Sequence, residues 1–235
     1  MIENKKVGTY LLYAVGEIFL VVVGILIALQ VNDWDDNRKK EKKVDSYKLF
    51  LLKDLQQDSI AMLDFLSNVE AGQKEFEAFQ KRLTAPSANL DTVYKIARYE
   101  ATLLADRVRP FNTNTFSALT STGDISLLPK QLTNLMFTLK RDQELIIELG
   151  DLTYQKFWSA TSEFSYRLPQ KNEISLINSG PINDHFWETI KKEEVAILLN
   201  KLVSAKQNHY RISKLILTQI QQQTYNLMNE LRKQK

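Results

Sequence analysis

The residue in the most unusual chemical setting is Glu17, the one carboxylate within an apolar run from Leu11 to Leu29. An ionised side chain at the centre of a bilayer costs about 3 kcal/mol on insertion scales, so such groups face a protein partner, face water or stay protonated. Glu17 is therefore a candidate for a hydrogen bond across a helix–helix interface. The alternatives are a neutral carboxyl group without a partner and a pathway group for protons or ions.

The two histidines, His185 and His209, do not form a recognisable metal or nucleophilic centre. No His-x-x-x-His or Glu-x-x-His pair occurs, and these spacings place two ligands on one helix face. The chain also has no cysteine, no G-x-S-x-G elbow and no glycine-rich phosphate loop. His209 falls on an apolar helical stripe, which favours a core histidine. We therefore expect no catalytic residue, no metal site, no cofactor and no enzymatic activity.

One loop concentrates positive charge beside an aromatic ring, because Arg107 and Arg109 precede Pro110 and Phe111. This loop could bind an anionic ligand or partner, and the alternative is a capping loop with exposed arginines. Elsewhere carboxylates alternate with lysines, as at 191–194, which is typical of a solvated helix face. The formal net charge of +3 is dispersed, whereas nucleic-acid binding requires a clustered basic face. We expect no nucleic-acid partner.

Residues 10–34 are the one segment that is long and apolar enough to cross a bilayer. The nineteen residues of its apolar run give about 28 Å of helix, close to the thickness of the hydrocarbon core. Tyr10, Tyr13 and Trp34 flank the run, where aromatic rings lie at membrane–water interfaces. The exit from the run matches an A-x-A-like cleavage site poorly. We interpret the segment as an uncleaved signal anchor whose partner is the lipid bilayer.

Helical spacing places Glu17, Val21, Gly24 and Ala28 near one face of this anchor. Gly24 and Ala28 form a small-xxx-small pair, which lets two helices approach closely. We interpret this face as an association surface for a second copy of the chain or for another membrane protein.

The anchor resembles the N-terminal signature of a family of uncharacterised bacterial single-pass membrane proteins, of the domain-of-unknown-function type, that is abundant in Bacteroidota. The resemblance is carried by YLLYAVGEI at 10–18, LVVVGILIALQ at 20–30, Asn32 and Trp34. A weaker resemblance covers TFSALTSTGDI at 115–125, where Thr122 separates a serine and a glycine that adjoin in the family pattern. The resemblance implies a membrane protein with a helical extramembrane domain, and it brings no activity with it.

Residues 1–9 form a short polar tail, and residues 35–235 read as one extramembrane domain. Apolar residues recur there at intervals of three and four, which indicates amphipathic helices. The helices predicted in this way cover 44–83, 89–105, 115–122, 129–166 and 193–232, with a loop at 171–182 and a brief apolar turn at Phe186 and Trp187. The predicted fold class is all-α, an N-terminal transmembrane helix followed by an elongated antiparallel helical bundle.

Basic residues lie on both sides of the anchor, Lys5 and Lys6 before it and five within 38–43 after it. The positive-inside count favours a cytoplasmic domain, whereas the family resemblance implies a periplasmic one. We prefer a bacterial inner-membrane protein with a periplasmic domain. The leading hypothesis is a membrane-anchored helical interaction or scaffold protein in a cell-envelope complex. The alternatives are a sensor-like ligand-binding bundle and a subunit of an oligomeric transport or channel complex.

Overall fold

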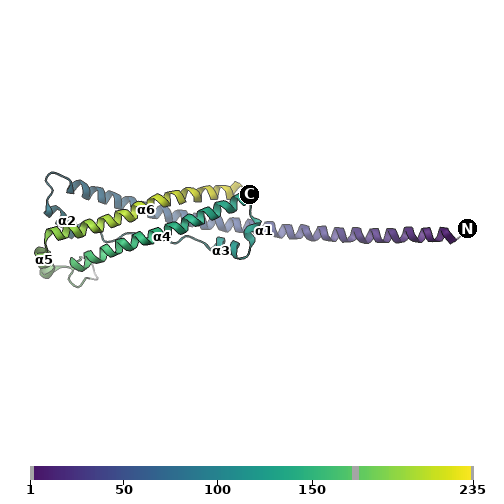
Figure 1. The fold of residues 1–235 in the computed structure, drawn as a ribbon, viewed down its shortest axis with the longest axis horizontal. Helices are drawn as coiled ribbons and strands as arrows, with labels where there is room; N and C mark the ends of the chain where they lie inside the picture. Colours follow the sequence, from purple (N-terminus) through teal and green to yellow (C-terminus); the bar gives the residue numbers. More distant parts are fainter. Residues whose placement is uncertain (1–2, 171–174, 234–235) are drawn as a thin grey trace.

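The computed structural model describes residues 3–170 and 175–233, with side chains from residue 13 onward. Every regular element within these ranges is a helix (Figure 1), which confirms the all-α prediction. The elements in chain order are α1 (Glu3–Leu83), α2 (Leu90–Tyr99), α3 (Asn114–Ser121), the 3-10 helix η1 (Asp124–Leu127), α4 (Lys130–Arg167), α5 (Gly180–Thr189) and α6 (Lys192–Lys233).

The helix α1 is unbroken over its 81 residues, which corresponds to a length of about 120 Å. Its N-terminal part, residues 3–42, precedes the ion pair of Lys43 with Asp124 and projects from the bundle, and we call it the projecting segment (Figure 1). Its most apolar window of eighteen residues has a mean hydropathy of 2.5 and none of it is buried. Because no proline or glycine lies between residues 25 and 71, nothing in the sequence breaks the helix where it becomes polar.

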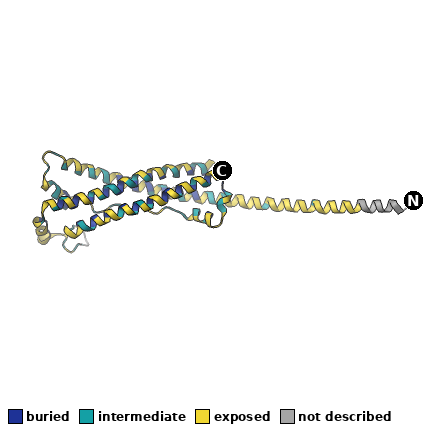
Figure 2. Ribbon diagram, viewed as in Figure 1, coloured by how far each residue is buried: buried dark blue, intermediate teal, exposed yellow. Residues whose placement is uncertain are grey.

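The remainder of α1 joins α4 and α6 in a bundle of three long helices whose facing sides are buried (Figure 2). The core divides into two parts along the bundle. The part nearer the projecting segment includes Leu55, Leu132 and Leu227, and the distal part includes Phe164, Trp187 and Val195. The start of α4 therefore packs against the end of α6, and the end of α4 packs against the start of α6.

The connection between α2 and α3 decides the direction of α4. Residues 100–113, which we call the strap, carry no regular structure and return the chain along the bundle to the end where α1 emerges (Figure 1). As a result α4 runs parallel to α1, and α6 is antiparallel to both. The strap adds Val108 to the core, where this side chain is 5% exposed.

The predicted helix over 89–105 is correct at its start and wrong at its end. Asn89 caps α2 by accepting hydrogen bonds from the backbone N–H groups of Asp91 and Thr92, but the helix stops at Tyr99. Leu104, which lies within the predicted range, is 80% exposed. Helical spacing in this stretch was misleading because the chain has to leave α2 in extended form to span the bundle.

Gly123 and Gly180 mark two helix ends, and both have a positive φ. Gly123 follows α3 and its cap residue Thr122 and adopts the left-handed conformation with φ of 75°, as glycine commonly does where a helix ends. The predicted loop over 171–182 is too long, because α5 begins at Gly180 with Pro181 in its first turn. Residues 171–174 lie outside the described residues. The predicted turn at Trp187 is part of this helix, and the indole is buried.

Candidate functional site

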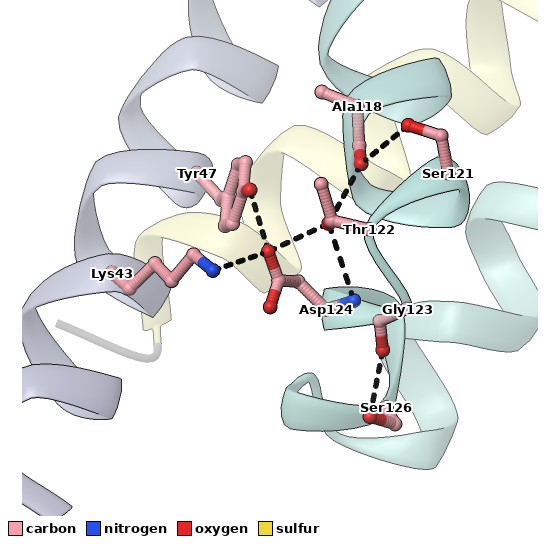
Figure 3. Close-up of polar contacts among 8 residues, drawn as sticks. All are labelled: Lys43, Tyr47, Ala118, Ser121, Thr122, Gly123, Asp124 and Ser126. Carbon is pink, nitrogen blue, oxygen red and sulfur yellow. Dashed lines mark hydrogen bonds and ion pairs between the residues drawn. The ribbon is translucent and has the colours of Figure 1, made fainter. Parts of the chain in front are cut away.

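The contacts that fix the projecting segment to the bundle converge on one carboxylate, that of Asp124 in η1 (Figure 3). The Asp124 Oδ2 atom accepts hydrogen bonds from the hydroxyls of Tyr47 at 2.8 Å and Thr122 at 2.6 Å. The Lys43 ammonium lies 2.7 Å from the same oxygen. These donors lower the pKa of Asp124 to about 2, with the Lys43 hydrogen bond as the largest cause. The carboxylate is therefore ionised throughout the physiological pH range.

The turn between α3 and η1 presents Asp124 to α1 (Figure 3). Gly123 supplies the left-handed backbone step, a conformation that costs other residues steric strain. The Thr122 hydroxyl, 2.9 Å from the Ala118 carbonyl oxygen, ties the turn to the last turn of α3. The Thr122 hydroxyl also donates a hydrogen bond directly to Asp124.

Two further carboxylates on the same face of α1 hold the chain just before this turn. The Asp54 Oδ2 atom accepts from the backbone N–H of Thr115 at 3.2 Å and from its hydroxyl at 2.6 Å. The Asp58 Oδ1 atom accepts from the backbone and side-chain nitrogens of Asn112, both at 2.8 Å. We call the set of contacts from Lys43 to Asp58 the junction. It fastens residues 112–124 along four turns of α1.

Asp58 differs from the other members of the junction because it is almost completely buried. Its side chain is 4% exposed, and its Oδ2 atom has no hydrogen-bond partner within the described part of the chain. Burial is the largest influence on this group and raises the pKa of the Asp58 carboxyl above its ordinary value. A small cavity of about 30 Å³ adjoins it, lined also by Asp54 and Gln143.

The residues predicted from sequence to form the membrane site all lie on the projecting segment. Glu17, Val21, Gly24 and Ala28 are exposed and share a helix face that contacts no other described element. A Cβ atom placed on Gly24 would meet nothing within 4 Å, so this position is open to a close neighbour. The assignment of this face as an association surface stays a prediction.

The predicted interfacial aromatics flank the same segment. Tyr13 and Trp34 are 77% and 64% exposed, and the Arg38 guanidinium lies 5.7 Å from the Trp34 ring centroid. The side chain of Tyr10 lies outside the described residues. The distance along the helix from Tyr13 to Trp34 is about 31 Å at 1.5 Å per residue, which is close to the thickness of the hydrocarbon core.

His209 is a fully buried core residue, as its place on an apolar stripe indicated. Its Nδ1 atom lies 2.8 Å from the Thr153 hydroxyl and its Nε2 atom lies 2.8 Å from the Asp106 carbonyl oxygen. Burial lowers the pKa of His209, which favours the neutral ring. Within residues 3–170 and 175–233, no three His, Asp or Glu side chains gather closely enough to hold a metal ion.

Sequence reasoning did not identify the junction. A signal was present in Asp58, which stands at a core position of the apolar stripe between Leu55 and Met62. A charged residue in such a stripe indicates a specific buried partner. The second signal was the segment 115–125 itself, which provides both Thr115 and Asp124 to α1.

These features define a class of protein. It is an all-α protein in which one exposed apolar helix, long enough to be a candidate for a single membrane span, continues into a bundle and is locked to it by polar contacts. The chain belongs to the family of unknown function DUF6090, whose family model matches residues 17–163. The matched range contains Glu17 and the whole junction. The comparisons with curated proteins and with solved structures found no match.

Proposed function

We propose that this protein is a membrane-anchored helical interaction or scaffold protein of the bacterial cell envelope, without catalytic activity of its own. The observation that supports it most directly is the contrast within α1. From residue 13 onward its projecting segment is almost entirely exposed, whereas its remainder is one of the three long helices of the bundle (Figure 2). A single helix thus joins a surface that requires a partner to a folded domain.

The projecting segment is too apolar to remain in water without a partner. Phe19, Leu20 and Ile25 are each more than half exposed, and burying one such side chain is worth about 1.5–3 kcal/mol. A helix spanning the hydrocarbon core satisfies all its backbone hydrogen bonds internally. The lipid bilayer is therefore the partner that fits the whole circumference of this segment, and a protein fits the face that carries Glu17.

The junction fixes the position of the anchor relative to the bundle. Because α1 continues without a break and Asp54, Asp58 and Asp124 fasten it laterally, the anchor and the bundle behave as one body. Association of anchors through the face of Glu17 and Gly24 sets the spacing and rotation of the attached bundles. We infer a homo-oligomer or a complex with another membrane protein, with the bundle in the periplasm.

The test is the native mass of the full-length protein in mild detergent. Glu17→Leu and Gly24→Leu both disrupt the assembly, because they remove an interhelical hydrogen bond and a close approach. Gly16→Leu, which adds the same bulk as Gly24→Leu on a different face of the anchor, leaves the mass unchanged. An unaltered mass in all three variants refutes the association surface. Recovery of the full-length protein in the soluble fraction after cell lysis refutes the membrane anchor separately.

A further inference from the structure

A hollow on the outer face of α4 brings together five side chains of complementary chemistry. It is lined by Arg107 of the strap and by Asp151, Tyr154, Gln155 and Trp158 of α4, and its volume is about 360 Å³. This volume is within the range of small-molecule sites. The α4 residues are spaced by three and four, so they share one face of the helix, and the strap forms the opposite wall. The strap is held there by Val108, whose side chain lies against Gly150.

The charged groups of the hollow neutralise each other. The Arg107 Nε and Nη2 atoms donate to the two oxygens of Asp151, each at 2.8 Å. The pair raises the pKa of Arg107 and lowers the pKa of Asp151, in both cases chiefly through this hydrogen bond. An anionic ligand would have to displace Asp151 from its partner, which argues against the anion site suggested by the sequence. The hollow instead favours a ligand without net charge.

The remaining polar groups of the hollow have no partner within the part of the chain that the structure describes. They are the Tyr154 hydroxyl, the Gln155 amide and the Trp158 indole N–H, for which no side-chain hydrogen bond occurs among residues 13–170 and 175–233. The Arg107 Nη1 group is likewise unused by its pair with Asp151. A ligand in the hollow thus meets donors and acceptors that are already in place.

Trp158 provides an apolar platform in this setting. Its side chain is 56% exposed, whereas Trp187, the other indole of the bundle, is buried. The ring of the neighbouring Tyr154 packs against the ring of the buried His209, with the ring centroids 5.6 Å apart. An exposed aromatic face next to planar polar side chains is suited to a molecule that is apolar on one face and hydrogen-bonding along its rim.

We propose that this hollow binds a neutral saccharide. The C–H face of one pyranose ring stacks on Trp158, and neighbouring hydroxyls bond to the paired Arg107 and Asp151 and to the Gln155 amide. A planar pair that offers a donor and an acceptor side by side matches two vicinal hydroxyls. The site goes beyond the anchoring and assembly role, because it gives the bundle a ligand, and it does not depend on α1 crossing a membrane.

The test measures binding of three probes, the trimers of N-acetylglucosamine, glucose and mannose, to the full-length protein. The detergent is an amine oxide, since a glycoside detergent competes for the site. We expect saturation-transfer NMR and tryptophan fluorescence to detect binding of at least one trimer. Trp158→Ala weakens this binding at least tenfold and Gln155→Ala weakens it severalfold. Leu152→Ala, an exposed position on the same helix that does not line the hollow, leaves it unchanged.

Which of the three trimers binds shows whether the hollow prefers glycans of amino sugars or glycans of simple hexoses. Three results overturn the proposal. Either no trimer binds the wild type, or Trp158→Ala binds as tightly as the wild type, or a small aromatic anion, 4-hydroxybenzoate, binds in the hollow in preference to every trimer. Equal thermal melting of the wild type and the variants ensures that a lost signal reflects the site. A failure here leaves the native mass unaffected, so it is distinguishable from a failure of the assembly hypothesis.

Discussion

The hydroxyl of Tyr47 donates a 2.8 Å hydrogen bond to the carboxylate of Asp124, joining residues 77 positions apart in the chain (Figure 3). Tyr47 belongs to the first turns of α1 inside the bundle, and Asp124 begins η1. The bond therefore lies where the projecting segment meets the folded domain. Any force on the projecting segment reaches the bundle through this part of α1.

Tyr47→Phe is expected to lower the free energy of unfolding by about 1 kcal/mol, because it removes a partly buried hydrogen bond without changing the packing of the ring. Urea unfolding followed by circular dichroism measures this change. Tyr225→Phe is the matched control, since Tyr225 is exposed and its hydroxyl bonds to no described residue. Equal stability of the two variants contradicts a structural role for the junction.

Acid is expected to weaken the junction. The pKa of Asp124 is lowered from 3.8 to about 2, so the unfolded chain binds more protons than the folded chain between these values. The stabilisation from Asp124 is thus complete above pH 4 and is lost as the pH falls toward 2. Melting curves between pH 2 and 5 should show a smaller loss in Asp124→Asn than in the wild type. A parallel loss in both proteins argues against this ion pair.

Asp58 is expected to have the opposite pH dependence. Its pKa is raised by burial, so the folded chain binds more protons than the unfolded chain between the two pKa values. The contribution of the neutral carboxyl is complete below the unfolded pKa and is lost as the pH rises through the folded value. The melting temperature of Asp58→Asn relative to the wild type should therefore rise with pH. Asp64→Asn, exposed on the same helix, should show no such trend.

Gly72 and Gly150 should respond in opposite ways to the same substitution. A Cβ on Gly72 would lie 2.5 Å from the ring of Tyr210, whereas one on Gly150 meets Val108 at an ordinary 3.4 Å. Alanine in place of a helical glycine stabilises by about 1 kcal/mol when there is room. Gly150→Ala should therefore raise the melting temperature and Gly72→Ala should lower it. A gain in both variants shows that Tyr210 moves aside without cost.

The proposed orientation of the anchor gives the fifth expectation. A reporter active only in the periplasm, fused to the C-terminus of the chain, should give a signal. Signal solely from a reporter active in the cytoplasm reverses the topology and supports the local charge count around the anchor. The N-terminal part of the chain then lies outside, and the proposed saccharide site faces the cytoplasm.

Much of the secondary structure was predictable because it depends on local spacing. The periodicity over 129–166 and 193–232 matches α4 and α6 within one residue at each end, since a long helix buries one continuous face. The strap was not predictable in this way. Leu103 and Leu104 have helical spacing relative to α2, but the path of the chain back along the bundle overrides a weak local preference.

The candidate sites likewise differ in whether local sequence or tertiary structure determines them. Sequence alone identified the apolar segment with Glu17, Gly24 and Ala28, because hydropathy and helical spacing are local properties that need no fold. Only the tertiary structure decided which polar residues meet, such as Asp124 with Tyr47 and Arg107 with Asp151. These pairs are set by the return of the strap and the left-handed turn at Gly123, which bring distant segments side by side. The apolar segment is therefore determined locally by the order of its residues, whereas the junction and the hollow exist only once the bundle has closed.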